Sequence, residues 1–191
     1  MSRPTSSGTF DRLAPDYDDL RPVDAAWWQV FDAIVAAAER LPFRAAWFER
    51  ATMRMVAHLL DRPRAFAELR RVLADDGRLV VATMDPETFG GHWLVPWFPA
   101  IPRIDAERFP SAERLEAELL AAGFDVHVDR LVQENAIDRD QALAKFRGRA
   151  FSTFDLLDED EFRAGLAEAE ARFPPRLPYR TTWLIVAADA R

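Results

Sequence analysis

A long glycine-free segment is the feature of this sequence that most limits its fold. Glycine occurs at position 8 and next at position 77, so residues 9–76 contain none. A loop whose backbone approaches a bound ligand closely needs glycine, because a Cβ atom would occupy the ligand's volume. The sequence therefore offers no loop of that kind between residues 9 and 76.

The first half of the chain still shows regular elements. Residues 24–38 begin with an aspartate and carry apolar side chains at helical spacing, which predicts a helix capped by Asp24. Residues 48–56 are a strand candidate, and a helix is predicted over 62–77 with a proline in its first turn. We expect Gly77 to end this helix in a left-handed conformation. The continuous apolar run 78–84 then predicts a strand that is buried on both faces.

The second half continues the alternation of helices and strands. The predicted elements are a helix over 112–123, a strand over 124–132, helices over 138–149 and 158–173, and a strand over 179–190. Ser111 is a suitable N-cap, and Gly123 is a suitable C-terminal stop. Asp158 with Glu161 three residues later has the arrangement of a capping box. The pattern predicts an α/β domain with an antiparallel edge.

Composition narrows the class of protein and its partners. With 191 residues and 49% hydrophobic content, we expect an N-terminal segment over 1–23 and a single domain over 24–191. The net charge of −7 argues against nucleic acid as a partner, and no apolar run is long enough to cross a membrane. There is no cysteine, which excludes disulfides and fits a cytoplasmic location.

Residues 38–86 resemble the second half of class I S-adenosylmethionine-dependent methyltransferases, a Rossmann-like family, and are most similar to its methyltransferase type 11 branch. The resemblance rests on a set of short motifs: Leu41-Pro42-Phe43, Phe48-Glu49, His58, Arg71-Val72-Leu73 and Asp75-Asp76-Gly77. The opening segment, with Tyr17-Asp18, is similar to the N-terminal segment of the same family. The resemblance implies methyl transfer to a small molecule, with S-adenosylmethionine as the cofactor.

One part of the family pattern has no counterpart here. Family members place strands one to three and a glycine-rich cofactor loop before the Leu-Pro-Phe motif, whereas here Ala36-Ala37-Ala38 leads directly into it. The resemblance then implies a truncated Rossmann-like fold, with a residual sheet order of about 4-5-7-6 and flanking helices. Strand four becomes an edge, and an apolar edge invites pairing. We expect the N-terminal segment or a second copy of the chain, in a homodimer, to protect it.

Three interpretations of the function follow from this loss. The chain is a small-molecule methyltransferase impaired in cofactor binding, or a non-catalytic remnant that serves as a binding or oligomerisation module. The third interpretation is that the shortened segment is an artefact of gene assembly.

The resemblance implies candidate cofactor contacts at three positions. Tyr17 lies near the cofactor in the family pattern, and Arg54 with Met55 matches positions that line its methionine end. The alternatives are a turn in which Asp18 sits beside an amphipathic Tyr17, a solvated Arg54 and a core Met55.

An aromatic, proline-rich segment follows the predicted strand over 78–84. In the family this region covers the substrate, which makes Trp93, Trp97, Phe98 and Phe109 candidate substrate contacts. The alternative is the ordinary packing of a long connection.

Histidines give little further indication of chemistry. His58 is a candidate base, with a structural role as the alternative, and no catalytic residue is assigned. The three histidines of the chain lack the spacing of metal ligands, so no metal site is predicted.

Overall fold

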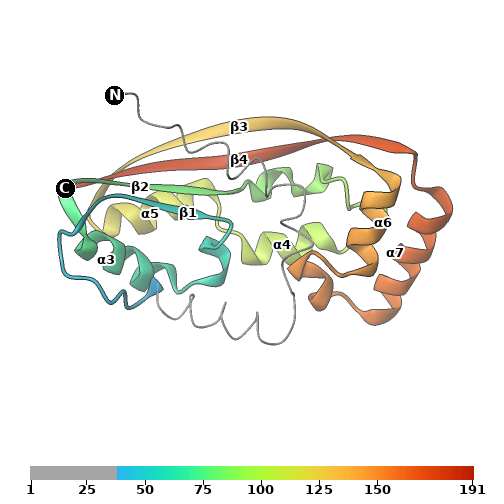
Figure 1. Ribbon diagram of the computed structural model, residues 1–191, viewed down its shortest axis with the longest axis horizontal. Coiled ribbons are helices and arrows are strands. Elements are labelled where there is room, and N and C mark those ends of the chain that lie inside the picture. Colours follow the sequence, from blue (N-terminus) through green and yellow to red (C-terminus); the bar gives the residue numbers. More distant parts are fainter. Residues whose placement is uncertain (1–37) are drawn as a thin grey trace, which may run out of the picture. The chain divides into compact units, whose positions relative to one another are not determined.

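The computed structural model describes residues 38–191 (Figure 1). The predicted domain boundary at residue 24 and nearly all of the predicted helix over 24–38 fall outside the described residues. Tyr17 and Asp18 also fall outside them.

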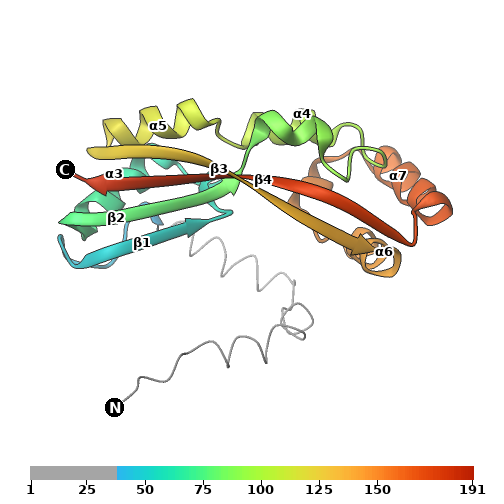
Figure 2. The same ribbon diagram turned by 90° about the horizontal axis from the view of Figure 1, so that it is seen from above.

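Four strands build one sheet: β1 (Phe48–Arg54), β2 (Leu73–Met84), β3 (Phe124–Asp138) and β4 (Arg176–Ala190). The strand order is β1-β2-β4-β3, so the last strand of the chain lies between β2 and β3 (Figure 2). β1 and β2 are parallel, whereas β4 is antiparallel to both of its neighbours. The α/β class is confirmed. Counting β1 as strand four of a complete family sheet, the observed order reads 4-5-7-6.

Helix α3 (Arg62–Val72) begins where the sequence predicts, with Asp61 as its N-cap, but ends earlier. The prediction that it continues to Gly77 is wrong, because Leu73 already pairs with β1 as the first residue of β2. Gly77 instead lies in a tight bend within β2. A Cβ atom there would lie 2.8 Å from the carbonyl oxygen of Ala74, which explains the need for glycine.

Helix α5 (Ala112–Ala121) has both predicted ends. The Ser111 side chain accepts a hydrogen bond from the backbone N–H of Arg114, and Gly123 has a φ of 91°. The left-handed backbone lets the chain turn back at once into β3. β3 runs beyond its predicted end at residue 132, because it pairs with β4 over the whole length of both strands.

Helices α6 (Arg139–Arg147) and α7 (Glu159–Arg172) lie at the far end of the β3–β4 ribbon (Figure 1). Asp158 caps α7 as predicted, by accepting from the backbone N–H of residues 160 and 161. The second half of the predicted capping box is wrong, since the Glu161 carboxylate accepts from the N–H of Ala100 instead.

The sequence did not predict the elements of the long connections. These are the helix α4 (Ile101–Arg108) and the 3-10 turns η1 (Ala57–Leu59), η2 (Pro86–Gly91) and η3 (Ser152–Leu156). Prolines and aromatic residues hide the helical period of α4, whose amphipathic pattern spans only two turns.

Two groups of buried side chains hold the unit together. One lies between the sheet and helices α3 and α5, and its members include Phe66, Leu79, Val81, Leu115, Leu119, Leu184 and Val186. The other, called the aromatic core here, comprises Trp93, Phe98, Phe146, Phe154, Phe162 and Phe173, between α4, α6 and α7. The aromatic core fixes the connection that follows β2, and with it the surroundings of the candidate site.

Candidate functional site

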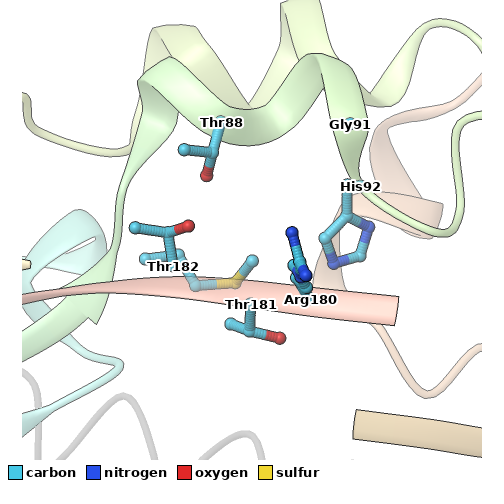
Figure 3. A pocket seen from close by; sticks show the side chains of 7 residues that line it. Thr88, Gly91, His92, Arg180, Thr181 and Thr182 are labelled. Atoms are coloured by element: carbon cyan, nitrogen blue, oxygen red, sulfur yellow. The ribbon is translucent and has the colours of Figure 1, made fainter. Parts of the chain in front are cut away.

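A small pocket lies where β2 ends and β4 begins. It has a volume of about 160 Å³ and is lined by Met84, Thr88, Gly91, His92, Arg180, Thr181 and Thr182 (Figure 3). In open α/β sheets, ligands bind outside the carboxyl ends of the parallel strands, and Met84 is the last residue of one of them. The pocket shares this position, but its volume is below the roughly 300 Å³ of a usual ligand pocket.

Asp85 fixes the wall of this pocket. It follows β2 directly, is 1% exposed and caps η2 by accepting from the N–H of Glu87. Its second carboxylate oxygen accepts from Arg130 Nε at 2.7 Å, and Arg130 also pairs with Glu87 at 3.1 Å. The hydrogen bond to Asp85 raises the pKa of the Arg130 guanidinium. Sequence reasoning missed this pair, whose members come from separate strands, although an aspartate before a proline at a strand end was a local signal for Asp85.

The polar groups of the pocket are mostly neutral. Burial lowers the pKa of His92 to about 4, so its imidazole is uncharged near neutral pH. The Thr88 hydroxyl donates to the Asp85 carbonyl oxygen at 2.8 Å. Arg180 is the cation of the pocket lining, and it pairs with Glu134 at 2.9 Å. Such a lining can position a small molecule through hydroxyl and imidazole hydrogen bonds.

The predicted cofactor contacts lie at the carboxyl end of β1. The Arg54 guanidinium lies 5.2 Å from the centre of the Trp183 ring, at the distance of a cation–π contact. Met55 has a φ of 53°, and its N–H donates to the Ala82 carbonyl oxygen at 2.9 Å. Neither side chain lines the pocket. Tyr17 falls outside the described residues, and the assignment of all three as cofactor contacts stays a prediction.

Of the four predicted substrate contacts, Trp93, Trp97 and Phe98 lie in or against the aromatic core. Trp93 is 6% exposed and stacks on Phe146 at 5.5 Å between ring centres, while Phe98 is fully buried. Trp97 stacks on Phe173 at 5.3 Å. These contacts are packing contacts, and only the neighbouring His92 reaches the pocket. A direct role of Trp93, Trp97 and Phe98 in binding substrate stays a prediction.

His58 and Phe109 meet near the end of β1. Their rings stack with 4.0 Å between centres. Burial lowers the pKa of His58 to about 4, and the positive charges of Arg108 and Arg62 add to the shift. This imidazole is therefore neutral near pH 7. Within residues 38–191, no group of three or more histidine or acidic side chains is arranged to hold a metal ion.

Comparisons with known proteins show what this chain is similar to. A model of a methyltransferase domain matches residues 18–81. The structure of a protein from Anabaena variabilis, assigned as a methyltransferase from an antibiotic biosynthesis pathway, aligns with a TM-score of 0.56 at 19% identity. The alignment covers 76% of this chain and 70% of that one. The alignment shows that the chain has a methyltransferase-like fold.

Other solved structures align less well with this chain. YcgJ of Bacillus subtilis aligns with a TM-score of 0.47 at 18% identity, over 81% of this chain and 68% of that one. A protein of Bacillus halodurans assigned as a methyltransferase aligns with a TM-score of 0.49 at 16% identity, over 80% of this chain and 74% of that one. A search of the curated proteins gave no match. No helix of residues 38–191 is long and apolar enough to cross a membrane.

S-adenosylmethionine is the cofactor that the similarity to methyltransferases implies, and the described residues do not fit it. Binding requires a glycine-rich turn between a first strand and a helix. In residues 38–191, β1 is the first strand, it forms an edge of the sheet, and the segment between β1 and α3 contains no glycine. Gly77, the first glycine of this part, is used in a bend of β2. No catalytic step can therefore be derived through the cofactor from these residues.

Proposed function

We propose that this protein is a methyltransferase-family protein that acts on a small molecule and is impaired in binding S-adenosylmethionine. One observation carries the proposal: the first strand of the described sheet, β1, is the counterpart of strand four in the family numbering. The elements that would hold the cofactor's nucleoside have no counterpart in residues 38–191. The substrate side, with the pocket at the end of β2, is retained.

The pocket supports a role in positioning the small molecule. Threonine hydroxyls and a neutral His92 can orient polar groups, and the Asp85–Arg130 pair keeps η2 against the pocket. Positioning of this type is how proteins accelerate transfer reactions without a dedicated base. Trp93 supports this arrangement, since its ring centre lies 6.1 Å from that of His92, and Trp97 and Phe98 pack in or against the same aromatic core. Tyr17, Arg54 and Met55 are our candidates for whatever contact with the cofactor remains.

Thermal unfolding with S-adenosylhomocysteine tests the impairment. A ligand present at about 1 mM with a Kd of about 1 μM would stabilise the protein by about 4 kcal/mol. For a chain of this size, that corresponds to a rise in Tm on the order of 10 °C. We expect no measurable rise in Tm for this protein. Circular dichroism would establish that the protein is folded. A rise of that size would contradict the proposal.

A second candidate function, a non-catalytic binding or oligomerisation module, is favoured by a separate observation. β1 is an edge of the sheet in the described part of the chain, and two large apolar side chains beside it are exposed. An edge strand offers backbone groups to another strand, and native proteins commonly protect such edges. This candidate predicts a partner strand along β1.

A further inference from the structure

The outer edge of β1 is able to accept another strand. Within residues 38–191, β1 pairs only with β2. Trp47 and Met55 both donate their N–H groups toward the β2 side of the strand, to the carbonyl oxygens of residues 72 and 82. Because successive residues of a strand direct their backbone groups to opposite sides, the groups of Arg50, Thr52 and Arg54 point outward.

Exposed aromatic side chains extend this edge. Phe43 is 44% exposed and Trp47 is 53% exposed. The Phe43 ring packs edge-to-face on Phe48, the first residue of β1, with 4.9 Å between ring centres. Arg44 lies 3.8 Å from the centre of the Trp47 ring. A row of outward-facing backbone groups next to exposed aromatic rings is typical of an interaction surface.

Symmetry limits how two copies of this strand can pair. Antiparallel pairing of β1 with β1 of a second copy requires a two-fold axis perpendicular to the sheet. Since side chains alternate between the faces, the axis must pass beside a residue that lies opposite its own copy. Most of β1 is paired only if the residue at the axis is Arg50, Ala51 or Thr52.

Charge selects among these three registers. Centring on Arg50 places that guanidinium opposite its own copy, and centring on Thr52 places Arg50 opposite Arg54 twice. Like charges directly opposite each other are destabilising. Centring on Ala51 avoids both conflicts, because Arg50 then faces Thr52, and Phe48 faces Arg54. The last pair brings a guanidinium against an aromatic ring, which is favourable.

We propose that two copies of this protein pair through β1, antiparallel, with Ala51 opposite Ala51 of the partner subunit. The two four-stranded sheets then form one continuous sheet. The small Ala51 side chain suits the close central pair of this arrangement, in which neither residue directs its backbone groups at the other. The proposal deepens the second candidate function, and it does not depend on cofactor binding.

Opposite charges at position 52 provide the test. Thr52 is exposed, so its replacement leaves the fold of the subunit intact. In the proposed register, residue 52 faces Arg50 twice in each dimer. Thr52→Glu therefore creates two opposite-charge pairs, and Thr52→Arg creates two like-charge pairs. We expect the dimer Kd, measured by sedimentation at low salt, to fall roughly tenfold for Thr52→Glu and to rise roughly tenfold for Thr52→Arg.

Matched controls carry the same charges on the other edge of the sheet. Val132 of β3 is 55% exposed, and Val132→Glu and Val132→Arg should leave the Kd unchanged. A monomeric wild-type protein at about 100 μM, a concentration well above a micromolar Kd, would overturn the proposal. Equal weakening by both Thr52 variants would also overturn it, because that result indicates pairing centred on Thr52. Protected β1 amides in a monomer would show that another segment of the chain occupies the edge. None of these results would bear on the thermal test with S-adenosylhomocysteine.

Discussion

The two ends of the sheet differ in how completely they are built. At the β3–β4 end, α6, α7 and the connection after β2 enclose the aromatic core, in which Phe98, Phe146 and Phe154 are fully buried. At the β1 end, Phe43 and Trp47 are exposed beside an edge strand. The contrast indicates that the end of the sheet covered by α6 and α7 has a core of its own.

The largest expected effect comes from truncating the aromatic core. Phe98 has no exposed surface and packs 4.7 Å from Phe154 between ring centres. Phe98→Ala should lower the free energy of unfolding by about 3–5 kcal/mol, because the lost contacts leave a cavity. Urea denaturation measures the change. Leu156→Ala, at a side chain that is 54% exposed, is the control and should change stability by less than about 1 kcal/mol.

Adding a methyl group to the same core should also destabilise it. A Cβ atom at Gly165 of α7 would lie 2.3 Å from the Trp97 carbonyl oxygen and 2.6 Å from the Phe98 ring. Gly165→Ala should therefore cost about 1–3 kcal/mol, since α7 must move away from the connection. Gly90→Ala, with nothing within 4 Å of the added atom, is the matched control for thermal unfolding. Equal Tm values for the two variants would contradict the tight packing of α7.

Two histidines, His58 and His92, predict a pH dependence. Burial lowers the pKa of His58 to about 4, with help from Arg108 and Arg62, and burial alone lowers the pKa of His92 to about 4. The unfolded chain has histidine pKa values near 6.5, so between these values it binds more protons than the folded chain. Stability should therefore fall as the pH is lowered from about 6.5 to about 4.

Single substitutions divide this pH dependence between the two histidines. His58→Phe keeps a ring to stack on Phe109 and removes the titrating group. The urea midpoint should therefore fall less as the pH is lowered. His92→Phe should remove the part of the pH dependence that His92 causes. An unchanged pH profile in the double variant would show that other groups cause the acid sensitivity.

The smallest expected effect lies at the β1 edge. Phe43→Ala should change the stability of the monomer by less than about 0.5 kcal/mol, because the ring is largely exposed. Denaturation at nanomolar protein, where an association of micromolar Kd is absent, measures this change. A loss comparable to that of Phe98→Ala would contradict the difference between the two ends.

Local signals in the sequence predicted much of the fold. The caps at Ser111, Gly123 and Asp158 depend on neighbouring residues, and the sequence located all three. The end of α3 was misplaced, because Leu73 leaves the helix to pair with β1, a contact between distant segments.

The candidate site was harder to predict than the fold. Arg130 and Asp85 come from separate strands, so no local pattern indicates their ion pair. Trp93 and Phe98 were predicted to contact substrate from their place in the chain, yet their burial follows from α6 and α7, whose packing the sequence does not reveal. The predicted contacts Arg54 and Met55 lie at the end of β1, where a strand end was expected.

Calorimetric titration of the full-length protein with S-adenosylhomocysteine tests the central claim most directly. The account predicts no detectable heat at a ligand concentration near 1 mM, from protein that is folded by circular dichroism, because micromolar affinity requires the missing glycine-rich turn. Saturable binding with a Kd of a few micromolar would contradict the account. It would mean that the chain rebuilds a cofactor site without the elements that relatives use.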